Sequence, residues 1–400
     1  MKRSLLFALG LLLFAACSDP ADPDPDPDPD PDPDPVPVLP VLGHGAISDR
    51  YTAEVAVSGT TAYTTTWAFR QHPGNTVNIW DVSGNVPVLV DTLLVPGANT
   101  LGDVQISPDG SLMVVPTESN GSLVIYDRSD PRAPTVITRY TSPEIEDGVH
   151  TVKLGDVDGT LYAFLQIDPG SNGPAQLVIL DLSNPASPQE VYVQPMGSPF
   201  VHDVFVRDGI LFAALWDDGM HIFDIGGGFV GGSPSNPVLI GSIESSEIHN
   251  IWWFHDPSSG EARYAFMGQE GPGSVGGNAS GDIHVVDISD MSNPVYVARY
   301  RVPGAGTHNF SMDEESGILY AAYYNGGVRA LDVRGDLGHC EEDEQTSTGV
   351  CDLALMGREV GAALHEDDHY VWGVAFQDTH VYASDMLSGL YKIDVSDLIR

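Results

Sequence analysis

Four histidines recur at one position of a repeated pattern, and their imidazoles are the side chains of this sequence best suited to chemistry. They stand in the short runs VHTV (149–152), VHDV (201–204), IHNI (248–251) and THNF (307–310). Neutral imidazole binds iron, copper, zinc and manganese, and a site with four or fewer protein ligands leaves a position for water or substrate. The pattern predicts a transition-metal site, with the metal left open among these four, formed by His150, His202, His249 and His308.

Acidic side chains stand at the ends of the strands that should pair beside these histidines. A carboxylate there can accept the distal N–H of a histidine ligand and so hold the ring in place. The alternative is that the histidines are structural and hydrogen-bond carbonyls of the loops between repeats. Only four of seven repeats carry the histidine, and these four are consecutive, which favours the metal site. The expected orienting carboxylates are Glu118, Asp168, Asp217, Glu270 and Asp385.

The elements that must position these side chains form a sevenfold repeat. A short apolar or mixed run closed by aspartate occurs seven times, as VNIWD, LVIYD, LVILD, MHIFD, IHVVD, VRALD and LYKID. Two β-like runs precede each aspartate and another follows it after a turn, so each unit offers four short antiparallel strands, which is one propeller blade. The sequence therefore predicts an all-β fold, a seven-bladed β-propeller of four-stranded blades over residues 36–400. Innermost strands surround the axis of a propeller, so the four histidines should converge near one end of it.

The third of these runs, Leu177 to Asp181, nearly spells the name of a known repeat. On this motif the chain resembles the LVIVD-repeat family of bacterial exported proteins. The resemblance implies a propeller outside the cytoplasm and implies no particular reaction.

The last repeat supplies only three strands before the chain ends. A propeller blade with a missing strand would leave unpaired edges. The segment Val36 to Ile47 precedes the first repeat and contains Val38, Val41 and Leu42. We expect this segment to complete the last blade and to join the two ends of the domain.

The N-terminus has the composition of a processing signal. Lys2 and Arg3 precede an apolar stretch that is too short to span a bilayer, which predicts a signal peptide over residues 1–16. The run LFAAC (13–17) resembles the bacterial lipobox, so Cys17 should receive the lipid and anchor the protein in a lipid bilayer. Ser18 at the next position permits sorting onward, which predicts an exported lipoprotein of the outer membrane or cell surface. From Asp19 to Asp34 the chain alternates Pro and Asp, so residues 17–35 should form a disordered, extended tether that begins at the lipidated Cys17.

The two other cysteines flank a polar, acidic insertion. In an exported protein, a pair at such short separation favours a disulfide between Cys340 and Cys351. A zinc site that adds His339 is the alternative, but no fourth ligand stands at ordinary spacing.

Composition narrows the function further. Seventeen basic residues against 56 acidic ones give a formal charge of −39, which repels nucleic acid. The chain has neither a Gly-x-Ser-x-Gly elbow nor a P-loop lysine. Two functions stay open: a surface-anchored binding module for a protein, glycan or small-molecule ligand on the histidine-bearing face, and a metal-dependent extracytoplasmic enzyme of the oxidoreductase or lyase type.

Overall fold

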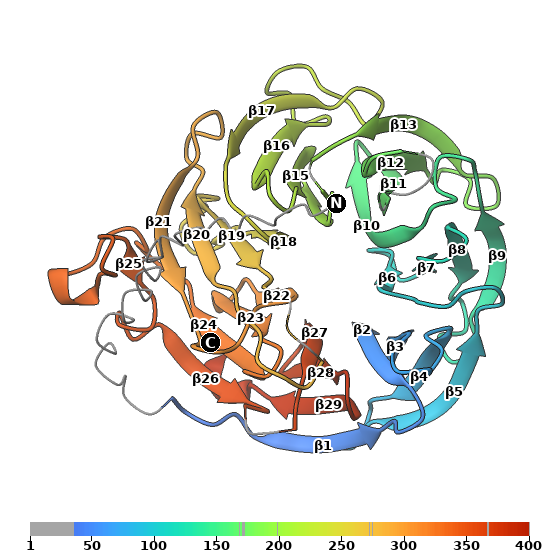
Figure 1. The fold of residues 1–400 in the computed structure, drawn as a ribbon, viewed down its shortest axis with the longest axis horizontal. Coiled ribbons are helices and arrows are strands. Elements are labelled where there is room, and N and C mark those ends of the chain that lie inside the picture. The colour runs from blue at the N-terminus through green and yellow to red at the C-terminus, as the bar shows by residue number, and fades with distance from the viewer. Residues whose placement is uncertain are drawn as a thin grey trace, which may run out of the picture. The chain divides into compact units, whose positions relative to one another are not determined.

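Seven antiparallel sheets surround a central channel in the computed structural model (Figure 1). The structure describes residues 36–400 except 168, 170–172, 198, 272, 274, 366, 367 and 400. The expected signal peptide (1–16), the lipidated Cys17 and the tether (17–35) lie outside the described residues. The fold is the predicted all-β propeller of seven four-stranded blades.

Each of the first six blades is formed by strands in chain order from the channel outward. Blades 1 to 3 contain β2 (Tyr51–Ser58), β3 (Thr61–Trp67), β4 (Thr76–Asp81) and β5 (Val88–Leu94); β6 (Gln105–Ile106), β7 (Leu112–Thr117), β8 (Ser122–Asp127) and β9 (Thr135–Tyr140); and β10 (Val149–Val157), β11 (Thr160–Ile167), β12 (Gln176–Asp181) and β13 (Gln189–Pro195). Blades 4 to 6 contain β14 (Asp203–Arg207), β15 (Ile210–Ala214), β16 (Met220–Asp224) and β17 (Val238–Ile243); β18 (Ile248–Trp253), β19 (Tyr264–Gln269), β20 (Ile283–Asp287) and β21 (Val295–Tyr300); and β22 (Phe310–Asp313), β23 (Ile318–Ala322), β24 (Val328–Asp332) and β26 (Glu359–Ala363).

The third strand of each blade carries the repeated motif, and its apolar side chains are buried between blades. The terminal aspartate of the motif fixes the turn that follows it. In blade 1, the backbone N–H and the hydroxyl of Ser83 both donate to Asp81 Oδ1, at 3.0 and 2.6 Å. These bonds lower the pKa of the Asp81 carboxyl. The aspartates therefore have a structural role, as expected of an Asp that precedes a Ser-rich turn.

Blade 7 is completed by the N-terminal segment. Its strands are β27 (Val371–Gln377), β28 (His380–Asp385) and β29 (Gly389–Asp394), and β1 (Val41–Ala46) pairs antiparallel with β29 as the outermost strand. Just upstream, Leu39 N–H donates to Ala362 O at 2.8 Å and Ala362 N–H donates to Pro37 O at 2.9 Å. One segment thus attaches to both blade 6 and blade 7, and the expected residues supply it.

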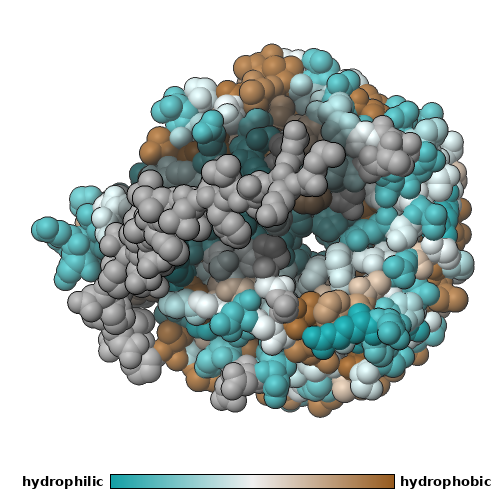
Figure 2. Space-filling model, in the orientation of Figure 1, coloured by the Kyte–Doolittle hydropathy of each residue, from teal (hydrophilic) through white to brown (hydrophobic). Residues whose placement is uncertain are grey.

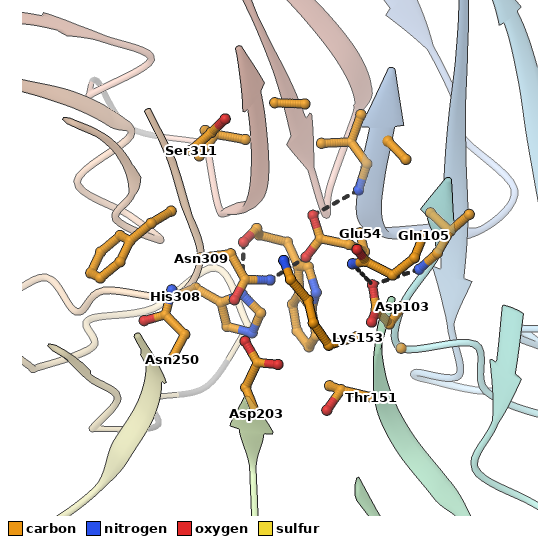
Figure 3. Close-up of a pocket in the computed structure, with 18 of the residues that line it drawn as sticks. Glu54, Asp103, Gln105, Thr151, Lys153, Asp203, Asn250, His308, Asn309 and Ser311 are labelled. Carbon is orange, nitrogen blue, oxygen red and sulfur yellow. Dashed lines mark hydrogen bonds between the residues drawn. The ribbon is translucent and has the colours of Figure 1, made fainter. Parts of the chain in front are cut away.

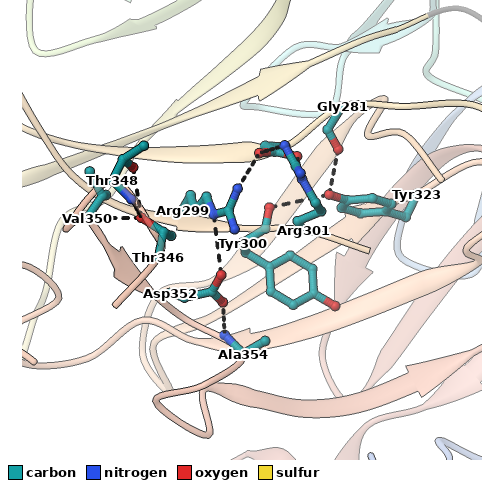
Figure 4. A network of polar contacts seen from close by, with 11 residues as sticks. Gly281, Arg299, Tyr300, Arg301, Tyr323, Thr346, Thr348, Val350, Asp352 and Ala354 are labelled. Carbon is teal, nitrogen blue, oxygen red and sulfur yellow. Dashed lines mark hydrogen bonds and ion pairs between the residues drawn. The ribbon is translucent and has the colours of Figure 1, made fainter. Parts of the chain in front are cut away.

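An insertion after β24 adds a fifth strand to blade 5. The strand β25 (Cys351–Asp352) pairs parallel with β21, and a disulfide joins Cys340 to Cys351. Arg299 Nε donates to Asp352 Oδ2 at 3.3 Å, and Asp352 Oδ1 accepts the Ala354 N–H at 3.0 Å (Figure 4). The insertion is therefore held to the propeller by a strand pairing and a partly buried ion pair. Two short 3-10 helices, η1 (Glu342–Glu344) and η2 (Ser396–Leu398), complete the secondary structure of the described residues.

On the face drawn in Figure 2, hydrophilic and intermediate residues are mixed with hydrophobic ones. Among the residues described, no helix has the length and apolar character needed to cross a membrane.

We predict that Leu39→Ala lowers the free energy of unfolding by about 2 to 3 kcal/mol, because it removes a buried side chain that packs into the core shared by blades 6 and 7. Urea denaturation followed by tryptophan fluorescence measures the loss. Val38→Ala is the matched control, since Val38 is 71% exposed and its truncation should change stability by less than about 0.5 kcal/mol. Equal losses in the two variants would contradict the role of this segment as a closing strap.

Candidate functional site: the central channel

Seven equivalent positions, one per blade, lie where the innermost strands begin, and we call them the channel positions. In blade 3, pairing between β10 and β11 shifts register between Val149 and Thr151, which is where His150 stands. The same shift occurs around His249 in β18 and Trp372 in β27. Such a β-bulge redirects the side chain of the extra residue, here into the channel. The channel positions are Ala53, Gly102, His150, His202, His249, His308 and Trp372.

The side chains at five of these positions and one tryptophan form a closed ring, which we call the aromatic circle. Trp67, at the end of β3, occupies the space beside Gly102, so it fills the part of the ring where blades 1 and 2 have small residues. Neighbouring ring centroids are 4.1 to 6.5 Å apart around the whole circle. Its members, in order, are Trp67, His150, His202, His249, His308 and Trp372.

The four consecutive histidines of the aromatic circle form an arc, which runs through His150, His202, His249 and His308. Polar contacts fix the imidazoles at both ends of this arc. His308 Nδ1 donates to the Trp372 carbonyl at 2.7 Å. His150 Nδ1 lies 3.2 Å from Glu118 Oε1, and His150 Nε2 lies 3.1 Å from His202 Nε2. The Nδ1 atoms of His202 and His249 are buried without a hydrogen-bond partner of standard geometry. The backbones of His249 and His308 nevertheless lie close enough to act as partners of the His202 and His249 rings, respectively.

Burial keeps these imidazoles neutral. It lowers the pKa of His202, His249 and His308 well below the usual value, and the neighbouring histidines lower it further. Neutral imidazole is the form that binds metal ions. His202, His249 and His308 are thus in their metal-binding protonation state at neutral pH.

The expected orienting carboxylates fall into different places. Glu118 lies beside His150, as described above. Glu270 Oε2 lies 3.8 Å from His249 Nε2, while Glu270 Oε1 accepts a hydrogen bond from the Tyr324 hydroxyl. Burial raises the pKa of Glu270 to about 7. Asp168 lies outside the described residues.

Two of the five carboxylates do not orient a histidine of the arc. Asp217 is exposed in the turn after β15 and has no ion pair or hydrogen bond to an imidazole in the described structure. Asp385 is fully buried and accepts hydrogen bonds from Tyr370 N–H at 2.6 Å and the Ser388 hydroxyl at 2.6 Å. Asp217 instead faces solvent, and Asp385 Oδ2 lies 3.5 Å from Nδ1 of His369, because blade 7 has Trp372 at its channel position.

One group of three side chains among the described residues lies close enough to share a metal ion. His202, His249 and Glu270 each offer a ligand atom, and the three atoms lie within 4.8 Å of one another. His150 and His308 are not part of this group. The structure thus brings two of the four predicted histidines, His202 and His249, together with one of the predicted carboxylates, Glu270.

A layer of polar residues lines the channel directly behind the aromatic circle, one residue after each channel position. It borders a cavity of about 270 Å³. Figure 3 shows Glu54, Asp203 and Asn309 directed toward the middle of this cavity. Asn309 Nδ2 donates to Glu54 Oε2. This polar layer consists of Glu54, Asp103, Thr151, Asp203, Asn250, Asn309 and Gly373.

The acids of the polar layer hold protons more strongly than ordinary carboxyls. Burial, and then the charge of Asp103, raise the pKa of Glu54 to about 8. Burial raises the pKa of Asp203 to about 7 and also raises that of Asp103, and the charge of Lys153 partly opposes both shifts. At neutral pH the channel therefore contains carboxyl groups that can take up or release a proton.

Reasoning from the sequence missed Trp67 and the polar layer. Aligning the residue after each channel position gives Glu, Asp, Thr, Asp, Asn, Asn and Gly, so the polar layer had a detectable signal. Trp67 had none, because it belongs to the second strand of its blade and reaches the channel only through the gap that small residues leave.

The comparisons with known proteins agree with this fold. The family model described as "LVIVD repeat" matches residues 172–193, 200–245 and 277–302. The chain contains LVIVD repeats. The matched segments fall in blades 3 to 5 and include His202, and the description of the LVIVD repeat carries no activity.

Among solved structures, 1162 chains match this LVIVD-repeat propeller. One of them is the C-terminal WD40 domain of Sif2, with a TM-score of 0.52 and 12% sequence identity, covering 88% of this chain and 85% of that one. No curated protein matches. At this identity the likeness gives the fold alone, so the function must be argued from the channel.

The raised pKa of Glu54 predicts that the protein loses stability as pH rises, and that Glu54→Gln removes this loss. Between pH 4.5 and 8 the folded protein holds a proton at Glu54 that the unfolded chain has lost, so this group makes folding less favourable as pH rises. From pH 5 to pH 8, the wild type should lose roughly 2 to 4 kcal/mol relative to the variant. Urea denaturation of both proteins at the two pH values measures this difference, and parallel pH profiles would contradict the assignment.

Proposed function

We propose that the protein is a lipid-anchored, extracytoplasmic binding propeller whose ligand meets the end of the channel that carries the aromatic circle. The observation behind this proposal is the circle itself, six rings in edge-to-face and tilted contact at one end of a polar cavity of about 270 Å³. The rings hold one another in place without a ligand, so little conformational entropy is lost on binding.

The ligand classes that fit are a protein loop, a glycan or a small molecule. Tryptophan and imidazole rings offer flat faces for stacking, and the polar layer behind them offers hydrogen-bond donors and acceptors. The net charge of −39 favours neutral or cationic ligands over anionic ones and argues against nucleic acid.

The anchor and the tether support display at a surface. A Pro-rich linker spans up to about 3.1 Å per residue, and the Pro-Asp alternation from Asp19 to Asp34 would give an anchored propeller a spacer of that kind. A binding domain on a spacer of this kind can reach partners beyond the membrane surface.

A metal-dependent enzyme of the oxidoreductase or lyase type is the second candidate. The specific observation that favours it is the group of His202, His249 and Glu270, which lies beside carboxyl groups that exchange protons near neutral pH. This candidate needs a bound metal ion as its electrophile, so it depends on whether these three side chains bind one.

We predict that Cys17→Ser abolishes incorporation of labelled palmitate and moves the protein from the membrane fraction to the soluble fraction. Ser18→Asp is the matched control, since it keeps the lipidated cysteine and should keep the label while changing the membrane in which the protein is found. Export of unlabelled wild-type protein in soluble form would contradict the anchor.

We also predict that ligand contacts concentrate on the histidine-bearing face. A photoreactive amino acid in place of the exposed Asp217 should form adducts in intact cells. The same group in place of Glu315, which is exposed in a turn at the opposite end of the channel, should form few. Equal labelling from both positions would show that this face is not the binding surface.

A further inference from the structure

The three side chains His202, His249 and Glu270 converge from two neighbouring blades. His202 precedes β14 and donates its backbone N–H to Ala214 O at 2.8 Å, which sets the start of the inner strand. His249 stands at the bulge of β18, and Glu270 follows β19, the strand paired with it. Each ligand atom is therefore positioned by the backbone of a strand or a strand end and not by a long loop.

The distances are close to those that one ion requires. Imidazole nitrogens and carboxylate oxygens bind first-row divalent ions at about 2.0 to 2.2 Å, which places ligand atoms of a tetrahedral site about 3.4 Å apart. His249 Nε2 and Glu270 Oε2 are 3.8 Å apart, and all three ligand atoms lie within 4.8 Å. Shifts within ordinary side-chain freedom bring the three atoms onto one ion.

Neighbouring groups hold the ligands in this orientation. The Tyr324 hydroxyl donates to Glu270 Oε1 and leaves Oε2 directed toward His249. The Trp216 ring stacks on His202 with centroids 5.1 Å apart. Only 3% of the His249 side chain and 12% of the Glu270 side chain are exposed. Hydrogen-bonded and packed surroundings of this kind are what tune and orient metal ligands.

The backbone also holds the two imidazole rings. The His202 ring has a hydrogen-bond partner in the backbone of His249, and the His249 ring has one in the backbone of His308, although the Nδ1 atoms fall short of standard geometry. An ion on the other ring nitrogen would fix the tautomer that carries a proton on Nδ1. His308 next to them already uses its Nδ1 in this manner, as a donor to a backbone carbonyl.

We propose that His202, His249 and Glu270 bind one divalent first-row transition-metal ion, zinc or ferrous iron, at this end of the channel. Two imidazoles and one carboxylate are a donor set for these ions, whereas calcium and magnesium prefer oxygen ligands alone. Three protein ligands leave coordination positions open toward the cavity and toward His150, whose Nε2 lies 3.1 Å from His202 Nε2. The inference rests on the proposed function, because the ion would stand at the surface where the ligand binds.

The test uses the full exported chain, stripped of metal with a chelator and titrated with Co²⁺, whose visible absorption reports coordination, followed by competition with Zn²⁺ and anaerobic Fe²⁺. We expect saturation at one ion per chain. Glu270→Gln should weaken binding by at least about 100-fold, and His202→Ala and His249→Ala should do the same. Glu118→Gln, the matched control for a carboxylate beside a histidine, should stay within about threefold of wild type, and so should His308→Gln.

Folding is checked in each variant by its thermal midpoint, and the isosteric Glu270→Gln keeps the test decisive if a histidine variant does not fold. The inference is overturned if no saturable site is found, if Glu118→Gln loses as much affinity as Glu270→Gln, or if His308→Gln abolishes binding. Cross-linking from position 217 in the Glu270→Gln protein separates this inference from the proposed function. Adducts formed by a protein that binds no metal would support the binding module without the metal site. Metal binding by a protein that forms no adducts would support the metal site without the binding module.

Discussion

The hydrogen bonds between β1 and β29 decide whether the molecule has a channel at all. The blades meet mainly through side chains, with single backbone hydrogen bonds such as the one from Val371 N–H to Tyr324 O, so an open blade would free the first and last inner strands, β2 and β27, to move apart. The closing segment removes this freedom from outside the ring, while the aromatic circle spans the same boundary from inside through Trp67 and Trp372. The geometry at the axis therefore depends on a strand at the outermost edge of blade 7.

With the ring closed, desolvation governs the chemistry of the channel. The same burial acts in opposite directions on its two kinds of titratable group, since it removes charge from imidazoles by lowering their pKa and from carboxyls by raising it. The channel thus carries far less charge than its composition suggests. A cation that enters can recover this charge by displacing protons from the acids and binding the neutral bases.

The fold was predictable because it is written seven times. Imperfect copies of one motif, each followed by a turn with its own aspartate, indicated the strands, the blade count and the channel positions of His150, His202, His249 and His308. The site was only partly predictable. A difference of about an ångström in side-chain position decides whether the Glu270 carboxylate would orient a histidine ligand or would itself bind the ion. Asp217 and Asp385 stand at equivalent places in the repeat, yet Asp217 faces solvent and Asp385 bonds to the backbone. Spacing in a sequence predicts where a residue lies in the fold but not the direction in which its side chain points.

A strand residue normally both pairs with the neighbouring strand and presents its side chain, and the bulge at the channel positions separates these two roles. Because the ladder passes around the bulged residue, His249 and Trp372 take no part in strand pairing, and their identity is not tied to the stability of the sheet. Ala53, which also lies in a register shift, shows how small the occupant can be. Substitutions at the channel positions can therefore change the lining of the channel one blade at a time, while the strand pairing of the blades stays the same.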